Sequence, residues 1–472
     1  MTRQHTQRTQ GTLRTAEVAG ARGVRRALGV VLTLLVLLAA ATGLTACGSR
    51  LPLKDFGTAP AAAGPAGQAG PPIPVGIVTS VSSPIGGDAF TGPLYGAQAF
   101  FRALNDAGGI GAVGGAGGRQ VKVFTCDDSG AGIGNQSCVH QLVDQDHVVA
   151  LVSGSVLQYA GASYVSSQGV PDIGGITIGT AYDQYPHLYQ IYGSDEPRNG
   201  RTVGWNGVMY QTTEVYRYFK ERLGLSRAVV VSYNQADSAR YAAELTQGLK
   251  AEGYDVLSET VDFALPDFAA VAAGMKADHA QLLLDAMDVR GNTGLCQAMA
   301  SAGVTVSAKV TNEQNWSEQV RQDYRQVPGC RAALWTTSDA RNYEDVQYPA
   351  VAAFRAAVQK YYPDRQGQLS EWELLGWAGA QWFTDAAASC GANVTRSCVD
   401  AYMNRPELYD AHGVLIPTDF VPRATPPSGP QHACLNVARW EDSAQGGKGG
   451  WVTQTPDMNA NCFAVPALPF RP

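Results

Sequence analysis

The chain has 472 residues, of which 45% are hydrophobic and 16% charged, and its formal net charge is -6. This composition is typical of a globular protein and excludes a disordered one. The acidic balance argues against a nucleic-acid partner, because such proteins offer a basic surface to the phosphates. Roughly 400 residues follow the N-terminal segment, more than the ~250–300 at which one core stops growing, so we expect two domains.

The N-terminus has the layout of a secretory signal. Three arginines within residues 22–26 precede an uncharged apolar run from Ala27 to Ala41, which is shorter than the ~20 residues of a membrane-spanning helix. The stretch Leu44-Thr45-Ala46-Cys47 then resembles the bacterial lipobox, whose cysteine is acylated and becomes the first residue of the mature chain. This resemblance implies a lipoprotein signal peptide over residues 1–46 and lipidation of Cys47. It places the protein on the extracytoplasmic face of the cell membrane; a secreted protein with a chance cysteine at the cut is the alternative.

A spacer follows the signal. Residues 57–72 consist almost entirely of Ala, Gly, Pro and Gln, a composition that cannot bury a core. We therefore expect residues 47–72 to form a flexible linker between the lipid and a folded body that begins near Pro74.

Eight cysteines remain when Cys47 is set aside for the lipid, and an even number favours disulfides in an oxidising compartment. Eight cysteines allow 105 connectivities. Short loop closure favours pairing neighbours along the chain: Cys126 with Cys138, Cys296 with Cys330, Cys390 with Cys398, and Cys434 with Cys462. None of the spacings is a CxxC, so we expect no zinc site.

From Pro74 onward, short apolar runs alternate with amphipathic stretches. In the first half we expect strands at Val75–Val78, Val121–Phe124, Val148–Val152 and Val170–Ile173, and helices at Pro93–Ala107, Asn135–Gln145 and Gln158–Gln168. In the second half we expect strands at Ala228–Ser232, Val256–Val261, Gln281–Leu284, Val306–Val310 and Ala332–Thr336, and helices at Val203–Leu223, Ala239–Ala251, Phe268–Lys276 and Thr293–Ala302. Two helices, Val351–Tyr361 and Trp372–Ser389, and a disulfide-clipped hairpin of Leu435–Trp440 with Gly450–Thr453 complete the chain. Such alternation predicts an α/β fold with parallel sheets and right-handed crossovers.

Motifs for cofactors and catalysis are weak. Gly109–Gly114 matches GxGxxG, but it follows a helix and leads into a strand, the reverse of a dinucleotide site, so a turn is favoured. His140 and His147 are too far apart for an HExxH-type site, and no GxSxG is present. We expect no metal and no cofactor. Asp127 and Asp128 follow the second strand and could act as general acids, although a turn role is favoured.

Several stretches together resemble the type I periplasmic binding proteins, especially the branched-chain amino acid branch. Their order along the chain carries the resemblance: Pro74–Ser80, Gly92–Gly111, Val121–Asp128, Val148–Ser155 and Gly169–Pro171. The resemblance implies two Rossmann-like lobes with parallel sheets joined by a three-crossover hinge. The N-terminal lobe would comprise residues 73–195 plus 342–403, and the C-terminal lobe residues 196–341 plus 404–472. The crossovers would lie near Tyr192–Gly200, Thr336–Arg341 and Asn404–Thr418.

The resemblance also implies a ligand site between the lobes. For the first lobe it indicates two sets of contacts to a carboxylate: Ser153, Gly154 and Ser155, then Gly175, Ile176 and Thr177. For the second lobe it indicates an acid for an ammonium group and an aromatic ring: Asp288 or Glu313, and Tyr233 or Tyr241. Replacing Asp288 or Glu313 by alanine should then weaken ligand binding and leave the melting point of the ligand-free protein nearly unchanged.

These features predict a lipid-anchored solute-binding protein, not an enzyme. It would capture a small polar ligand, an amino acid or related carboxylate, and deliver it to the permease of an ABC importer. A ligand sensor for a membrane signalling partner would share the fold, and neighbouring permease and ATPase genes would favour transport. A surface hydrolase using Asp127 or Asp128, or a structural envelope protein without a ligand, are the remaining alternatives.

Overall fold

The computed structural model describes residues 70–83, 86–111 and 117–472. The signal segment, Cys47 and nearly all of the linker lie outside the described residues, as do residues 112–116 of the glycine-rich turn. Within the described ranges, none of the helices combines the length and the apolar character needed to cross a membrane.

In the described part of the chain, six strands form a first sheet. Their order is β2-β1-β3-β5-β4, with β6 paired to β5, and all these pairings are parallel. The strands are β1 (Ile73–Thr79), β2 (Val121–Asp127), β3 (Ala150–Val152), β4 (Ser155–Val156), β5 (Asp172–Thr177) and β6 (Leu188–Gln190). Six of the seven residues of β1 are buried, as expected for a parallel strand covered on both faces.

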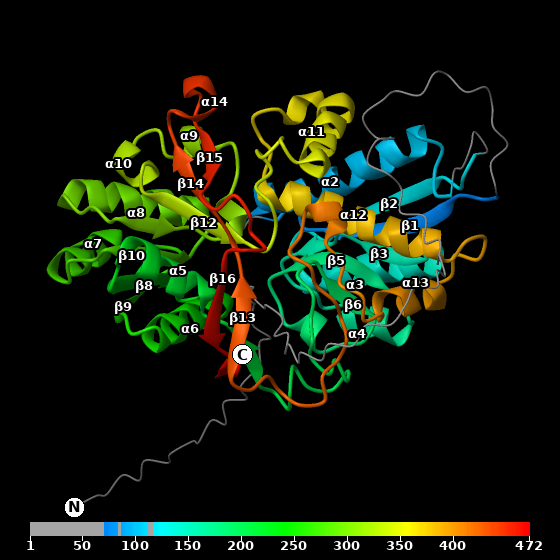
Figure 1. Cartoon of the computed structure of the whole chain (residues 1–472), viewed down its shortest axis with the longest axis horizontal. Helices are drawn as coiled ribbons and strands as arrows, with labels where there is room; N and C mark the ends of the chain where they lie inside the picture. The colour runs from blue at the N-terminus through cyan, green and yellow to red at the C-terminus, as the bar shows by residue number, and fades with distance from the viewer. Residues whose placement is uncertain (1–69, 84–85, 112–116) are drawn as a thin grey trace, which may run out of the picture.

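Helices from two distant parts of the chain cover this first sheet (Figure 1). They are α2 (Gly87–Asp106), α3 (Gly132–His140) with the π-helical η1 (Gln141–Gln145), α4 (Ala162–Ser167), η2 (Ala181–Asp183), α11 (Pro349–Tyr361), η4 (Pro363–Arg365), α12 (Glu371–Ser389) and α13 (Arg396–Met403). The helices α2 and α12 meet at glycines: a Cβ on Gly96 would lie 1.8 Å from the carbonyl oxygen of Glu373. The later segment is thus an integral part of the first lobe.

The second sheet contains seven strands among the described residues, in the order β15-β14-β12-β11-β10-β8-β9. They are β8 (Arg227–Tyr233), β9 (Asp255–Val261), β10 (Leu282–Ala286), β11 (Ala308–Val310), β12 (Leu334–Ser338), β14 (Asn436–Glu441) and β15 (Gly450–Thr453). The first five run parallel, whereas β14 and β15 add an antiparallel edge. The helices of this half are α5 (Glu214–Leu223), α6 (Ala236–Ala251), α7 (Phe268–Ala277), α8 (Val289–Ala302), η3 (Glu313–Asn315), α9 (Val320–Asp323), α10 (Pro328–Arg331) and α14 (Ala444–Gly447).

Two predicted helices differ from the observed ones by six residues or more at their N-termini. The helix predicted at 203–223 is wrong in its first half: only α5 is helical, and β7 (Met209–Gln211) precedes it and pairs with β17 (Leu468–Phe470). Gly204 and Gly207 take positive φ values there, a left-handed backbone that interrupts a helix. Conversely, α2 begins six residues before Pro93, so this proline lies inside the helix instead of at its start.

The four disulfides of the structure are the four predicted pairs. The predicted hairpin also forms, from β14 and β15. The Cys434–Cys462 bond closes the segment that contains this hairpin, as predicted; the two cysteines themselves belong to β13 (Pro430–Cys434) and β16 (Cys462–Pro466), which form a separate two-stranded sheet.

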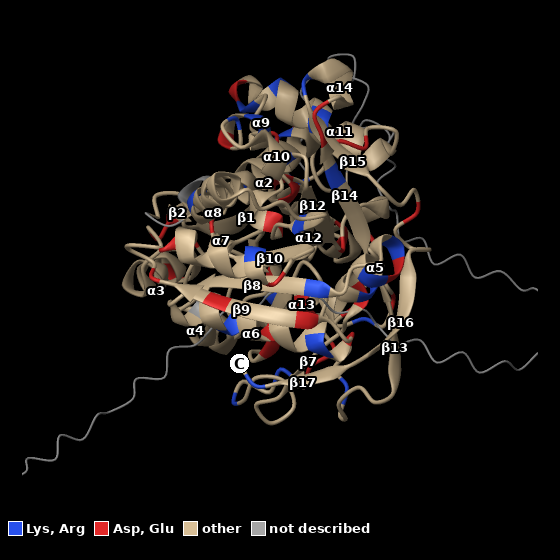
Figure 2. Ribbon diagram, turned by 90° about the vertical axis from the view of Figure 1, so that its left-hand side faces the viewer, with Lys and Arg blue, Asp and Glu red and all other residues tan. Residues whose placement is uncertain are grey.

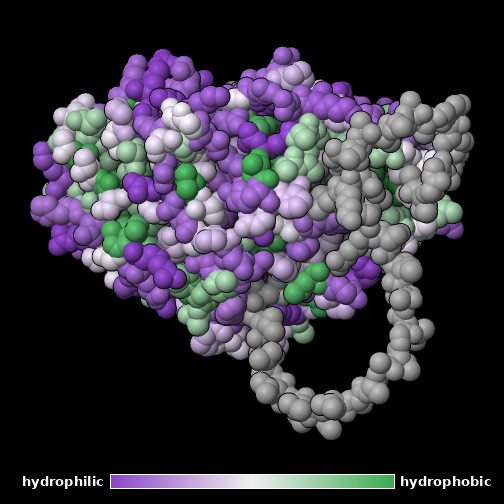
Figure 3. Space-filling view, turned by 45° about the horizontal axis from the view of Figure 1, so that its top comes forward, coloured by the Kyte–Doolittle hydropathy of each residue, from purple (hydrophilic) through white to green (hydrophobic). Residues whose placement is uncertain are grey.

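We call the first sheet with its helices the N-lobe and the second sheet with its helices the C-lobe (Figure 1). The chain passes between them after β6, after β12 and after α13, and η5 (Ala411–Gly413) lies in the last connection. The three predicted crossovers fall at these connections, and the exact limits of the lobes stay a prediction. Acidic and basic residues are interspersed over the ribbon (Figure 2), and the face in Figure 3 is mostly hydrophilic with small separate apolar patches.

Candidate functional site

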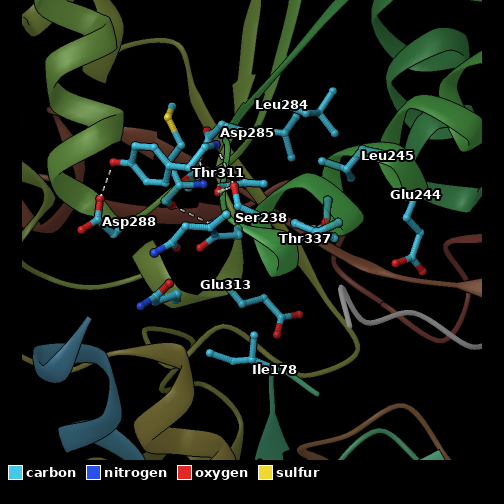
Figure 4. A pocket seen from close by; sticks show the side chains of 18 of the residues that line it. Ile178, Ser238, Glu244, Leu245, Leu284, Asp285, Asp288, Thr311, Glu313 and Thr337 are labelled. Carbon is cyan, nitrogen blue, oxygen red and sulfur yellow. Dashed lines mark hydrogen bonds between the residues drawn. The ribbon is translucent and has the colours of Figure 1, made fainter. Parts of the chain in front are cut away.

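A cavity of about 450 Å³ lies between the two lobes. The C-lobe contributes residues at the carboxyl ends of β8, β10, β11 and β12, among them Tyr233, Leu284, Val310 and Thr337. Figure 4 labels Leu284 and Thr337 of this set. The N-lobe side is formed by Phe90, Leu157, Gln158, Ile176, Ile178, Tyr192 and Trp372. This is where open parallel α/β sheets bind ligands, because loops and helix N-termini converge at the carboxyl ends of the strands.

Asp288 and Tyr233 form a fixed pair on the C-lobe wall. The Tyr233 hydroxyl donates to Oδ1 of Asp288 at 3.0 Å, and the same oxygen accepts the backbone N–H of Gly291 at 2.9 Å. Asp288 is therefore the N-cap of α8 as well as a cavity residue. Burial, aided by the neighbouring Asp288, raises the pKa of Tyr233, so its hydroxyl remains a hydrogen-bond donor at neutral pH.

A buried ion pair supports the wall behind Asp288. Nζ of Lys309 lies 2.5 Å from Oδ2 of Asp285, and both side chains are fully buried. Asn292 donates to Oδ1 of Asp285 at 2.8 Å and accepts from Lys309. Asp285 lines the cavity, so Lys309 neutralises the negative charge of this carboxylate from inside the lobe.

Glu313 connects the two lobes. It follows β11 in η3 of the C-lobe, and the Tyr192 hydroxyl donates to its Oε2 at 2.5 Å. Tyr192 is buried in the first connection between the lobes, and burial together with Glu313 raises its pKa well above the ordinary value. In Figure 4 the Glu313 side chain extends toward Ile178 of the N-lobe side. A hinge movement would therefore change the surroundings of this carboxylate.

Five of the ten predicted ligand residues line the cavity: Ile176, Tyr233, Tyr241, Asp288 and Glu313. Ser153, Gly154, Ser155 and Gly175 are not among the lining residues, and the side chain of Thr177 lies outside the described part of the structure. Ser153 is fully buried and donates its hydroxyl to the carbonyl oxygen of Gly376 at 2.8 Å. Gly175 packs so closely on Tyr182 that a Cβ would lie 1.9 Å from its hydroxyl oxygen. The structure thus gathers the predicted C-lobe residues at the cavity and leaves most of the N-lobe set behind its wall.

Several other lining residues were not among the ligand residues expected from the sequence. Phe90 and Trp372 lie far apart in the sequence, at α2 and α12, and their rings are 5.9 Å apart. Phe263 comes from the loop after β9 and packs edge-on against Tyr233. Lys309 is not a lining residue but supports the wall from behind. Its importance could have been noticed in the sequence, because it is the one charged residue in the strand Ala308–Val310.

Asp127 and Asp128, the candidate general acids of a hydrolase, accept hydrogen bonds that hold the turn after β2. Asp128 is buried and accepts hydrogen bonds from Ser80 Oγ at 2.6 Å, from Gly130 N and from Asn135 Nδ2. Neither Asp127 nor Asp128 lines the cavity. Within the described residues, the one group with metal-ligand geometry contains His432, Cys434 and Cys462, and its two cysteines are joined in a disulfide.

Comparisons with known proteins agree with this geometry. A family model described as periplasmic binding protein matches residues 72–448. Among solved structures, the branched-chain amino acid transporter substrate binding protein of Streptococcus pneumoniae, in complex with isoleucine, is 16% identical with a TM-score of 0.59, covering 81% of this chain and 99% of that one. An ABC transporter substrate binding protein of Aeropyrum pernix is 13% identical with a TM-score of 0.62, covering 84% and 97%. A fatty acid ABC transporter substrate-binding protein of Thermomonospora curvata is 15% identical with a TM-score of 0.58, covering 84% and 95%.

No curated protein matches the chain in sequence. At such low identity the solved structures bear on the fold alone, whereas the family model spans most of the chain. The match and the two-lobe α/β architecture together show that this chain belongs to the periplasmic binding protein family and has its type I fold.

Proposed function

We propose that the protein is a lipid-anchored, extracytoplasmic solute-binding protein that captures a small organic ligand between its lobes and delivers it to an ABC importer. The observation that carries this proposal is the cavity of about 450 Å³ whose wall is shared by both lobes. Members of the family are substrate-binding proteins, not enzymes. The turn role of Asp127 and Asp128 is consistent with a site for binding alone.

The proposed mechanism is closure of the lobes around the ligand. The chain crosses between the lobes three times, and residues that absorb changes in φ and ψ at such connections act as hinges. A ligand that contacts both walls binds the closed form more tightly and shifts the population toward it. The permease would then recognise the closed form.

The proposal is tested by thermal unfolding of the purified protein against amino acids, organic acids and amines. A ligand present at 100 times its dissociation constant stabilises the folded state by about 2.7 kcal/mol. For a cooperative unit the size of one lobe this corresponds to an increase in Tm of about 5–10 °C. A shift confined to one chemical class would support the proposal, whereas the lack of any shift with a folded, ligand-free sample would argue against it.

The anchor is tested separately at Cys47. We expect the wild-type protein to fractionate with membranes and to carry a diacylglyceryl mass on the peptide that begins at Cys47. Cys47→Ser should lose both properties while the folded body keeps its melting temperature. Membrane fractionation that is unchanged in Cys47→Ser would contradict lipid anchoring at this residue.

A further inference from the structure

The charged groups that line the cavity are acidic, and each already has a partner within the protein. They are Glu244, Asp285, Asp288 and Glu313 (Figure 4). Two of them form ion pairs, Asp285 with Lys309 at 2.5 Å and Glu244 with Arg240 at 3.3 Å. The other two accept hydrogen bonds from tyrosine hydroxyls, and Asp288 is also the N-cap of α8, where the helix dipole stabilises its charge. A ligand ammonium group would therefore share these oxygens with partners that are already in place.

A ligand carboxylate would find no counter-charge at this wall. None of the described lining residues is Lys, Arg or His, so an anion would meet only charges of its own sign, and like charges repel each other strongly inside a protein. On the N-lobe side, the hydroxyl of Ser153 donates to the carbonyl oxygen of Gly376, and Ser153 does not line the cavity. The electrostatics of the wall therefore favour a ligand without ionised groups.

Three carboxamide side chains at the cavity are available to such a ligand. They are Gln158, in the N-lobe loop after β4, and Gln235 and Gln314 of the C-lobe. None of them makes a side-chain hydrogen bond within the described part of the chain, and Gln235 leaves the N-terminus of α6 without a side-chain cap. A carboxamide offers N–H donors and an oxygen acceptor but no charge. These side chains are therefore suited to orient a ligand whose own polar group both donates and accepts hydrogen bonds.

The N-lobe side supplies a surface for the body of the ligand. We call it the apolar face; it consists of Phe90, Leu157, Ile176, Ile178 and Trp372. The rings of Phe90 and Trp372 lie 5.9 Å apart, and aromatic faces of this kind pack well against other rings. The cavity of about 450 Å³ also lies within the ~300–1,000 Å³ typical of pockets for small organic ligands. A ring with a short polar side chain fits this description.

We propose that the ligand is an uncharged organic molecule with an apolar body and one polar group that both donates and accepts hydrogen bonds, as a carboxamide does. The polar group would bind the glutamine side chains, and the body would pack against the apolar face. This inference rests on the proposed function, because it names the ligand class of the same cavity. It departs from the amino acid expected from the sequence, whose two ionised groups would each need a partner of opposite charge.

The test compares probes that share one apolar body and differ in charge at pH 7. Indole-3-acetamide is uncharged, indole-3-acetate is an anion, tryptamine is a cation and L-tryptophan carries both charges; 3-phenylpropionamide, 3-phenylpropionate, 3-phenylpropylamine and L-phenylalanine form a second set. Each is titrated calorimetrically into the full chain purified from membranes in detergent. Because burial of an unpaired charge is costly, we expect each amide to bind at least about tenfold more tightly than the charged members of its set. A smaller preference, a charged probe that binds best, or no binding of either amide would overturn the inference.

Variants then locate the polar group of the ligand. Gln235→Leu and Gln314→Leu replace half-buried glutamines, keep the approximate size of the side chain and remove its amide. Each should weaken amide binding about fivefold or more, as expected for the loss of a hydrogen bond between neutral groups. Gln366→Leu is the control, because this glutamine is exposed and lies outside the cavity. Equal amide affinities in all three variants, with unchanged melting temperatures of the ligand-free proteins, would contradict this placement.

The two levels of the account fail differently when these amides are added to the thermal unfolding screen. If amino acids, organic acids or amines stabilise the protein and the amides do not, the inference of an uncharged ligand is wrong and solute binding stands. If no compound of the extended screen stabilises the folded, ligand-free protein, solute binding itself is contradicted.

Discussion

The ion pair between Lys309 and Asp285 is the most decisive point at which to perturb the wall of the cavity. Both side chains are fully buried, and Nζ lies 2.5 Å from Oδ2. Lys309→Met keeps an apolar side chain of similar length but leaves the Asp285 carboxylate buried without its cation. The carboxylate would retain hydrogen bonds from Asn292 Nδ2 at 2.8 Å and from Met287 N at 3.3 Å.

The expected cost follows from the energetics of buried charge. Removing one partner of a buried pair typically lowers the free energy of unfolding by about 3–5 kcal/mol. For a lobe-sized cooperative unit this corresponds to a decrease in Tm of roughly 6–20 °C. Differential scanning calorimetry is the suitable assay, because it can separate the transitions of two lobes that do not unfold together.

Two further variants make this prediction specific. Lys360→Met makes the same substitution at the surface, where the Lys360 side chain is 59% exposed and pairs with Asp106. It should lower the free energy of unfolding by no more than about 1 kcal/mol. Asp285→Asn combined with Lys309→Met removes the remaining buried charge and should recover more than half of the loss. If Lys309→Met is no more destabilising than Lys360→Met, the argument that this pair supports the wall is refuted.

Three other predictions address packing, pH and covalent links. In Gly96→Ala the new Cβ would lie 1.8 Å from the carbonyl oxygen of Glu373, so α2 must move away from α12. The free energy of unfolding, measured with a denaturant, should fall by about 1–3 kcal/mol. An unchanged denaturation midpoint would contradict the close contact between the two helices. Burial raises the pKa of Asp172 to about 6, above its unfolded value. The contribution of this carboxyl to stability is therefore complete below pH ~4 and is lost as the pH rises through 6. Relative to Asp172→Asn, the free energy of unfolding of the wild type should fall by roughly 3 kcal/mol between pH 4 and 7. A difference between the two proteins that does not change with pH would refute this. Replacing Cys296 and Cys330 together by serine removes a bond between residues 34 positions apart in the sequence. Chemical denaturation should then show a free energy of unfolding lower by about 3–4 kcal/mol. A decrease of less than about 1 kcal/mol would argue against this bond.

The regular part of the fold could be predicted because buried parallel strands are continuous apolar runs. Ala228–Ser232 was expected as a strand, and β8 extends it by one residue at each end. Where glycines interrupt an apparently amphipathic stretch, the same reasoning fails. The helix expected from Val203 begins only at Glu214, because the chain first turns at Gly204 and Gly207 and forms β7. The partner of β7 is β17, more than 250 residues away, and no local pattern indicates such a pairing.

The candidate site was predictable where it depends on strand ends. Asp288 and Glu313 follow β10 and β11, and the carboxyl ends of neighbouring parallel strands place them at one edge. The hydrogen bond from Ser153 to Gly376 joins residues 223 positions apart, so the sequence could not indicate that this hydroxyl is already used.

The structure also revises the alanine prediction for Asp288. This residue caps α8, and loss of an N-cap costs about 1 kcal/mol. Asp288→Ala should therefore lower the melting point of the ligand-free protein as well as its affinity, whereas Asp288→Asn separates the two effects.

The most direct test of the account is a crystal structure of the protein with the compound that gives the largest thermal shift. The account predicts that this compound lies in the cavity between the lobes, in contact with the carboxyl ends of β8, β10 and β11 and with the apolar face that includes Ile176 and Trp372. A compound bound elsewhere on the molecule, with the cavity between the lobes filled by solvent alone, would contradict the central claim.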